Sequence, residues 1–350
     1  MNHKRHPPTV MITGASAGVG RATSIAFARR GARIGLLARG RAGLEAARRD
    51  VEAAGGHALM LEADVASAAD VEAAATALEE AFGPIDIWVN NAMASVFSPV
   101  ASMTADEYAR VTAVTYLGVV HGTLSALRRM RPRNRGAIVQ VGSALAYRGI
   151  PLQSAYCGAK HAVQGFCDSL RCELLHDKSG VRLTMVQLPA LNTPQFNWVK
   201  SRLHGRAQPV PPIFSPEVAA SAIVWASGQD RREVMVGWPS VQAIVGNKIA
   251  PGVADWYLSR HGYEAQQTSE PEDEARPHNL WAPVDAEQDF GIEGRFSARA
   301  RGFSAQLWLT RHRAAVAAVA VALTGGLAAL VRGSRPAGAP RRETAGAAAD

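Results

Sequence analysis

The stretch that decides the fold is Thr9-Val10-Met11-Ile12-Thr13-Gly14-Ala15-Ser16-Ala17-Gly18-Val19-Gly20. Its first residues are apolar or β-branched and suit a buried strand. Residues 21–30 then follow a helical pattern until Gly31 ends it. Glycines between a strand and a helix let the backbone approach a pyrophosphate, whose charge is stabilised by the free N–H groups at the helix N-terminus. The stretch therefore predicts a dinucleotide-binding loop.

Short apolar runs alternate with helical patterns beyond this loop. Strands are expected over residues 33–38, 57–62, 85–90, 137–141, 181–188 and 233–236, and helices over 41–54, 69–81, 105–130 and 154–175. This alternation predicts an α/β fold of the Rossmann type, a doubly wound and mostly parallel sheet with a C-terminal extension. The ligand should lie beyond the carboxyl ends of the strands, where the glycine loop, Asn91, Ser143 and Pro189 fall.

Tyr156 and Lys160 lie one helical turn apart in Tyr156-Cys157-Gly158-Ala159-Lys160, thirteen residues after Ser143. Side chains at this spacing share a helix face, so an ammonium can lie beside a phenol and favour its ionised form. Tyrosine ordinarily ionises near pKa 10 and is a poor base at neutral pH without such a neighbour. The pair therefore predicts a site of proton transfer.

Four motifs in this order resemble the short-chain dehydrogenase/reductase family. They are the Gly-x-x-x-Gly-x-Gly loop after Thr13, Asn90-Asn91-Ala92, Ser143 and Tyr156-x-x-x-Lys160, and the resemblance covers about residues 9 to 240. It implies an oxidoreductase in which Lys160 holds the nicotinamide ribose, Tyr156 exchanges a proton with the substrate oxygen and Ser143 hydrogen-bonds that oxygen. Hydride then moves between the nicotinamide ring and the substrate carbon.

The resemblance also implies which residues hold the dinucleotide. They are Gly14, Ser16, Gly18, Val19 and Gly20 in the loop, Asp64 and Val65 at the adenine, Asn91 and Ala92, Tyr156 and Lys160, and Thr193 at the nicotinamide amide.

Arg39 follows Ala38 at the end of the second predicted strand, where enzymes that use NAD usually place an aspartate. A guanidinium there can bind a 2′-phosphate through two charge-assisted hydrogen bonds. We therefore expect NADP(H) as the cofactor and no metal. The alternative is a solvated surface arginine in an arginine-rich chain.

Three positions depart from the family's pattern. Thr115 stands where an asparagine commonly maintains a water link from the lysine to solvent, and a hydroxyl lacks the paired donor and acceptor of an amide. Met93 and Ala190 stand where the family has glycine, and they add bulk at the nicotinamide end. These departures motivate an alternative function, a catalytically weak NADPH-binding sensor or a membrane-associated scaffold.

Residues 191–214 correspond to the family's variable substrate-binding region. Phe196, Trp198 and Val199, with several prolines, suggest an apolar lid, although such aromatics equally serve packing. We expect interconversion of a secondary alcohol and a ketone or aldehyde on a hydrophobic small molecule. We also expect a homo-oligomer.

Composition divides the chain into three parts. Residues 1–262 are expected to form the catalytic domain, 263–300 a flexible polar linker, and 301–350 a basic tail. Residues 314–331 carry no charge and are just long enough to cross a hydrocarbon core of about 30 Å. They form either a transmembrane anchor or an alanine-rich helix that packs on the domain or stays loose.

Charge and termini limit the partners and the location. The net charge of +8 comes mostly from arginine, and the basic tail could favour anionic lipid. The sequence contains no nucleic-acid motif, so no nucleic-acid partner is expected. Residues 1–8 lack the apolar core of a secretory signal, so we expect a cytoplasmic catalytic domain. Cys157, Cys167 and Cys172 lack metal-ligand spacing and are expected to serve packing.

Overall fold

The structure is a computed structural model that describes residues 7–273, 275–316 and 318. The chain forms two units, Met1–Ala305 and Gln306–Asp350. All of the predicted motifs lie in the first unit, and helix α11 (Ala305–Arg311) begins at the last residue of that unit.

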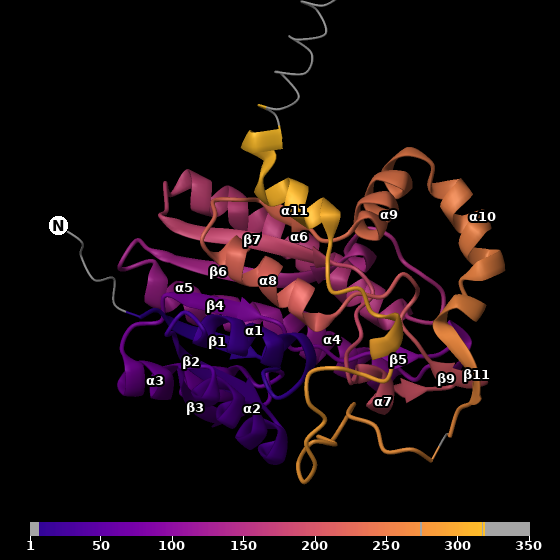
Figure 1. Ribbon diagram of the computed structural model, residues 1–350, viewed down its shortest axis with the longest axis horizontal. Coiled ribbons are helices and arrows are strands. Elements are labelled where there is room, and N and C mark those ends of the chain that lie inside the picture. Colours follow the sequence, from indigo (N-terminus) through magenta and orange to yellow (C-terminus); the bar gives the residue numbers. More distant parts are fainter. Residues whose placement is uncertain (1–6, 274, 317, 319–350) are drawn as a thin grey trace, which may run out of the picture. The chain divides into compact units, whose positions relative to one another are not determined.

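A seven-stranded parallel sheet forms the centre of the first unit (Figure 1). The strand order is β10-β7-β6-β4-β1-β2-β3, and every neighbouring pair is parallel. The strands are β1 (Thr9–Thr13), β2 (Arg33–Ala38), β3 (His57–Glu62), β4 (Ile87–Asn90), β6 (Gly136–Ser143), β7 (Val181–Leu188) and β10 (Glu233–Met235). The predicted doubly wound fold is confirmed.

Helices cover both faces of the sheet. One face carries α1 (Gly18–Ala28), α2 (Arg41–Ala53) and α8 (Pro216–Ser227), with α1 packed against the other two. The other face carries α3 (Ala68–Phe82), α4 (Ala105–Thr112), α5 (Gly118–Met130) and α6 (Ser154–His176). Because both faces are covered, the central strands are mostly apolar, and Met11, Ile12 and Trp88 are fully buried.

The direction of winding reverses beside β1. The chain adds β2 and β3 on one side of β1, and α3 then returns it to β4 on the other side. Val10 consequently pairs with Ile34 of β2 and with Ile87 of β4. In an open α/β sheet this reversal leaves a crevice beyond the carboxyl ends of the strands, where ligands bind.

The helix predicted over residues 105–130 has an irregular centre. It consists of α4, a π-helical turn over Ala113–Leu117, and α5. Such a turn adds a residue to the ordinary helical repeat and is frequent at functional sites. Thr115 lies within it and is fully buried.

Further elements follow β7 and β10. They are α7 (Gln195–Trp198), β8 (Lys200–Ser201), which pairs with β5 (Val96–Phe97), β9 (Gly205–Ala207), α9 (Trp238–Ile249) and α10 (Pro251–His261). They lie on the carboxyl side of the strands, where residues 191–214 were expected to cover the site.

The predicted flexible linker over residues 263–300 is instead packed against the domain. Its strand β11 (Gln267–Pro271) pairs with β9 in an antiparallel ladder. Leu280 is 1% exposed and belongs to the main hydrophobic core, and Phe296 is 6% exposed in a smaller cluster with Phe97 and Phe196. A few well-spaced apolar side chains thus anchor a segment that is polar on average.

The predicted transmembrane span, residues 314–331, lies mostly outside the described residues. Within the part of the chain that the structure describes, no helix combines the length and the apolar character that a membrane crossing requires.

Candidate active site

The glycine loop has a backbone that other residues would strain or block. Gly14 and Gly18 have φ angles of +65° and +55°, in the left-handed region. A Cβ on Gly20 would lie 2.0 Å from the carbonyl oxygen of Gly14. The three glycines therefore let the loop turn tightly and begin α1 at Gly18, with the positive end of the helix dipole directed at the crevice.

Thr13 and Asn91 join the carboxyl ends of β1 and β4. The Thr13 hydroxyl accepts hydrogen bonds from the backbone N–H groups of Asn91 (2.9 Å) and Ala92 (3.0 Å). The Asn91 amide donates to the carbonyls of Thr13 (2.9 Å) and Gly14 (3.1 Å). Asn90 points elsewhere and donates to Gln140 within the sheet. Two motifs that are far apart in the sequence thus form one hydrogen-bonded unit, in which Asn91 fixes the loop.

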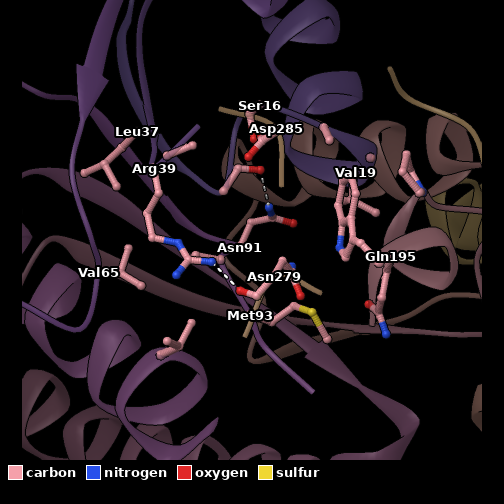
Figure 2. A pocket seen from close by; sticks show the side chains of 18 of the residues that line it. Ser16, Val19, Leu37, Arg39, Val65, Asn91, Met93, Gln195, Asn279 and Asp285 are labelled. Carbon is pink, nitrogen blue, oxygen red and sulfur yellow. Dashed lines mark hydrogen bonds between the residues drawn. The ribbon is translucent and has the colours of Figure 1, made fainter. Parts of the chain in front are cut away.

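A first cavity of about 190 Å³ lies beside this unit (Figure 2). Its lining includes the predicted residues Gly14, Ser16, Gly18, Val19, Arg39, Asp64, Val65, Asn91, Ala92 and Thr193. Gly20 does not line it and acts through the packing of the loop. Arg39, Asp64 and Val65 follow β2 and β3, where the sequence predicts the adenosine end of a dinucleotide site, and we therefore call this the adenosine cavity.

A second cavity of about 800 Å³ is lined by Ser143, Tyr156 and Lys160, and we call it the catalytic cavity. The two cavities share five lining residues, Val19, Asn91, Met93, Thr193 and Gln195. They therefore adjoin one another, as expected if one dinucleotide extends from one to the other. Met93, which replaces one glycine of the family's pattern, lines both cavities. Ala190, which replaces another, lines the catalytic cavity.

Burial controls the ionisation of Lys160 and Tyr156. Lys160 is 2% exposed, and its Nζ donates to the Val141 carbonyl at 2.7 Å and lies 5.6 Å from the centre of the Tyr156 ring. Burial lowers the pKa of Lys160 to about 8. Burial also raises the pKa of Tyr156 above its ordinary value, although the Ser143 hydroxyl lowers it in part. Contrary to the expected effect of Lys160, the phenol therefore keeps its proton at neutral pH.

Thr115 binds the backbone rather than a water link. Its hydroxyl donates to the Ala94 carbonyl and accepts from the Ala94 N–H, both at 2.9 Å. The residue is fully buried. The single donor of the hydroxyl is thus used to fix the segment after β4, close to Met93.

Arg39 and Asp64 lie at the adenosine cavity but already have partners. The Arg39 guanidinium donates to the carbonyls of Trp281 (2.9 Å) and Asn279 (2.5 Å). Asp64 accepts from Arg110 at 2.6 Å. Burial lowers the pKa of Arg39, and the charge of Asp64 raises it in part. Arg39 is therefore not a freely solvated surface arginine, because its guanidinium is hydrogen-bonded to two backbone carbonyls.

Sequence reasoning missed the part of the site that comes from the C-terminal segment. Asn279, Val284 and Asp285 line the adenosine cavity. The adjacent apolar pair Leu280-Trp281 inside a polar stretch was the one available signal. That pair indicates an anchor point, but not the cavity it serves.

The short chain dehydrogenase model matches residues 8–202, more than half of the chain. The chain belongs to this family. An uncharacterized oxidoreductase of Bacillus subtilis (strain 168), YxnA, is 30% identical over 275 residues, which are 76% of each protein. The dehydrogenase/reductase SDR family protein 7-like of Anopheles gambiae is 30% identical over 74% of this chain and 84% of its own.

The family also accounts for the fold. The crystal structure of levodione reductase is similar with a TM-score of 0.59 and 28% identity, over 67% of this chain and 98% of that chain. As a short chain dehydrogenase, the protein is an oxidoreductase whose fold binds a nicotinamide cofactor. The residues present fit that group, because the glycines let the backbone turn tightly at the N-terminus of α1 and the two cavities adjoin one another.

Proposed function

We propose that this short chain dehydrogenase uses NADP(H) to interconvert a hydrophobic secondary alcohol and the corresponding ketone, or an aldehyde and its alcohol. The observation that carries the proposal is that Ser143, Tyr156 and Lys160 line a single cavity, which shares five lining residues with the adenosine cavity. A volume of about 800 Å³ lies within the range of roughly 300–1,000 Å³ that small-molecule sites have.

The protonation states favour the reductive direction at neutral pH. Tyr156 retains its proton because of burial, so it can donate that proton to a substrate carbonyl oxygen while hydride is added to the carbonyl carbon. Ser143 donates a hydrogen bond to the same oxygen as negative charge develops on it. The bound dinucleotide supplies the hydride and is oxidised as the carbonyl is reduced.

Lys160 has two functions in this scheme. Its ammonium lies over the Tyr156 ring and stabilises the phenolate that remains after proton donation. Its position between β6 and α6, fixed by the Val141 carbonyl, suits it to hold the nicotinamide ribose. Because its pKa is about 8, the ammonium is lost as the pH rises above that value.

Arg39 supports the choice of NADP(H). It extends from the end of β2 to the rim of the adenosine cavity, where Figure 2 shows it pointing toward Asn279. A guanidinium at this position can hold a 2′-phosphate with paired hydrogen bonds. Residues 38 and 39, at the end of β2, are alanine and arginine, so neither supplies the carboxylate that usually binds the ribose 2′-hydroxyl of NAD from this strand.

The lining of the catalytic cavity supports a hydrophobic substrate. Apolar side chains come from four regions, namely Leu145 and Ile150 after β6, Phe196 of α7, Val210 in the segment after β9, and Leu258 of α10. Such a lining favours a bulky apolar body, with the reacting oxygen directed at Ser143 and Tyr156.

The proposal is tested by following NADPH oxidation over ketones and aldehydes of increasing apolar size. Tyr156→Phe should lower the rate by roughly 10²–10⁴-fold, because the proton donor is lost. Tyr147→Phe is the matched control, since Tyr147 does not line the catalytic cavity and its hydroxyl donates to Glu233 at 2.7 Å. Undiminished activity in Tyr156→Phe would refute the assigned role, and the absence of activity with every carbonyl would favour a non-catalytic NADPH sensor.

A further inference from the structure

The C-terminal segment crosses the adenosine cavity with both ends fixed. One end is held by Leu280, which is buried in the main core, and the other by Phe296, whose N–H donates to Asn192 at 3.0 Å. We call residues 281–291, between these anchors, the strap. The strap belongs to the orange loop that follows β11 in Figure 1.

The strap engages groups that a dinucleotide also needs. Its Trp281 carbonyl accepts from the Arg39 guanidinium, the cation proposed to bind a 2′-phosphate. Its Gly291 carbonyl accepts at 3.1 Å from the N–H of Gly18, the first residue of α1. A carbonyl at this helix N-terminus occupies the position that favours the pyrophosphate.

The strap also covers the N-terminus of α2. The carbonyls of Asp285 and Ala286 accept from the N–H groups of Gly43 and Ala42, both at 3.1 Å. These contacts satisfy two of the donors that a helix leaves free at its start. They bring Asp285 to the wall of the adenosine cavity, opposite the end of β2.

Asp285 places a carboxylate at the proposed 2′-phosphate position. A Cβ on Gly40 would lie 1.9 Å from its Oδ1, and a Cβ on Gly43 would lie 2.6 Å from its Oδ2, so both glycines make room for it. Ser16 lies at the same end of the cavity in Figure 2. Asp285 and Arg39 line the same cavity, and the negative charge of Asp285 raises the pKa of Arg39 in part.

We infer that the strap selects the dinucleotide, and that Asp285 is its specificity-determining residue. A 2′-phosphate takes Arg39 from the Trp281 carbonyl and is repelled by Asp285, so its binding moves residues 281–291 off the cavity while Leu280 and Phe296 stay in place. This inference rests on the proposed use of NADP(H).

The direction of the exchange follows from the strengths of the bonds. Hydrogen bonds from a guanidinium to phosphate are roughly twice as strong as those to neutral carbonyls. A ligand shifts an equilibrium only as far as it binds the two states differently. A 2′-hydroxyl offers Arg39 no charge and meets no repulsion at Asp285, so NADH lacks the means to open the strap. The closed strap therefore lowers the apparent affinity of the protein for both NADPH and NADH, and only NADPH has the 2′-phosphate that opens the strap.

The experiment compares Asp285→Asn with the parent chain, using NADPH and NADH fluorescence to measure Kd. The variant should bind NADPH about 3–10-fold more tightly, with less than a twofold change for NADH. Asp230→Asn is the matched control, because Asp230 is exposed and does not line either cavity. Equal effects on both dinucleotides, or weaker NADPH binding, would overturn the role of Asp285.

Strap movement is measured separately by chymotrypsin cleavage after Phe290, located by mass spectrometry. Phe290 packs edge-on against Trp198, with ring centres 4.8 Å apart, and is partly buried in the closed strap. Adenosine 2′,5′-bisphosphate should accelerate cleavage at least threefold, and 5′-ADP should not. Binding of the bisphosphate with unchanged or slower cleavage would overturn the strap and leave the proposed reaction intact.

The same assay separates the strap from the chemistry. Faster cleavage in a protein that reduces no carbonyl would support the strap and contradict the proposed reaction. A protein that binds neither the bisphosphate nor NADPH would overturn both.

Discussion

The two cavities of the site are built in different ways. The catalytic cavity takes its reactive groups from one short stretch, with Ser143 at the end of β6 and Tyr156 and Lys160 on α6. The adenosine cavity is completed by contacts across the chain, such as that between Arg39 and Trp281, 242 residues apart. The groups proposed for the chemistry are thus close together in sequence, whereas the adenosine cavity is completed by residues 279–285, far along the chain from β2. Changes in one cavity should consequently alter rates, and changes in the other should alter affinity.

Ser143→Ala should lower the rate of carbonyl reduction strongly while leaving the affinity for NADPH almost unchanged. Loss of a hydrogen-bond donor to the developing oxyanion should lower kcat for carbonyl reduction by roughly 10²–10³-fold. The Kd for NADPH, measured by fluorescence titration of the same variant, should change less than twofold because Ser143 does not line the adenosine cavity. A matching loss of NADPH affinity would show that the two cavities do not act separately.

Leu280→Ala tests whether the C-terminal segment is part of the folded domain. Removing this side chain, which is 1% exposed, should lower the free energy of unfolding by about 3 kcal/mol in urea denaturation. Val253→Ala is the control, since Val253 is 65% exposed and should change stability by less than about 0.5 kcal/mol. A negligible effect of Leu280→Ala on the free energy of unfolding would instead support the prediction that residues 263–300 form a flexible linker.

The catalytic cavity was largely predictable because its signals are short-range. A strand followed by glycines and a helix, and a tyrosine and lysine at helical spacing, each depend on neighbours within a few residues. The parallel sheet then brings these motifs to one edge, as the link between Thr13 and Asn91 illustrates.

The adenosine cavity was not predictable in the same way. Residues 263–300 are polar on average, and although the pair Leu280-Trp281 indicates an anchor point, nothing local indicates that Asp285 lines the same cavity as Arg39. The sequence also does not show that Lys160 and Tyr156 are buried. The expectation of a lowered tyrosine pKa therefore included the charge of Lys160 but not the effect of desolvation, which raises the pKa of Tyr156.

A smaller effect, confined to affinity, is expected for Arg39→Asp. It should weaken NADPH binding by roughly 10–30-fold, because a paired charge-assisted contact is replaced by repulsion. NADH binding should stay the same or become tighter, since the strap loses its contact with Arg39. Arg30→Asp, in the exposed turn that follows α1, is the control in fluorescence titrations. Equal weakening of both dinucleotides would remove Arg39 from the 2′-phosphate.

The smallest effect concerns the base of the substrate lid, where Glu107 joins α4 to β8. Burial raises the pKa of Glu107, but hydrogen bonds from Arg202 and Lys200 outweigh it and hold the pKa at about 2. Ionised Glu107 therefore stabilises the fold above its ordinary pKa of about 4.5, and this stabilisation is lost as the pH falls from there toward 2.

Glu107→Gln should accordingly lower the free energy of unfolding by on the order of 1 kcal/mol at pH 7. The cost is small because Lys200 and Arg202 are 26% and 29% exposed and can be rehydrated. The difference from the parent should shrink between pH 4.5 and 2 in thermal unfolding. A difference that stays constant over this range would mean that the charge of Glu107 is not the cause.

The most direct test of the hydride-transfer site follows the atoms themselves. NADPH deuterated at the transferable C4 position is incubated with a ketone that the protein reduces, and the product is examined by mass spectrometry. We predict deuterium on the carbinol carbon for the parent chain and Tyr147→Phe, with formation of this product reduced by roughly 10²-fold or more in Tyr156→Phe. Product without deuterium at that carbon, or undiminished transfer in Tyr156→Phe, would contradict the assignment of the catalytic cavity.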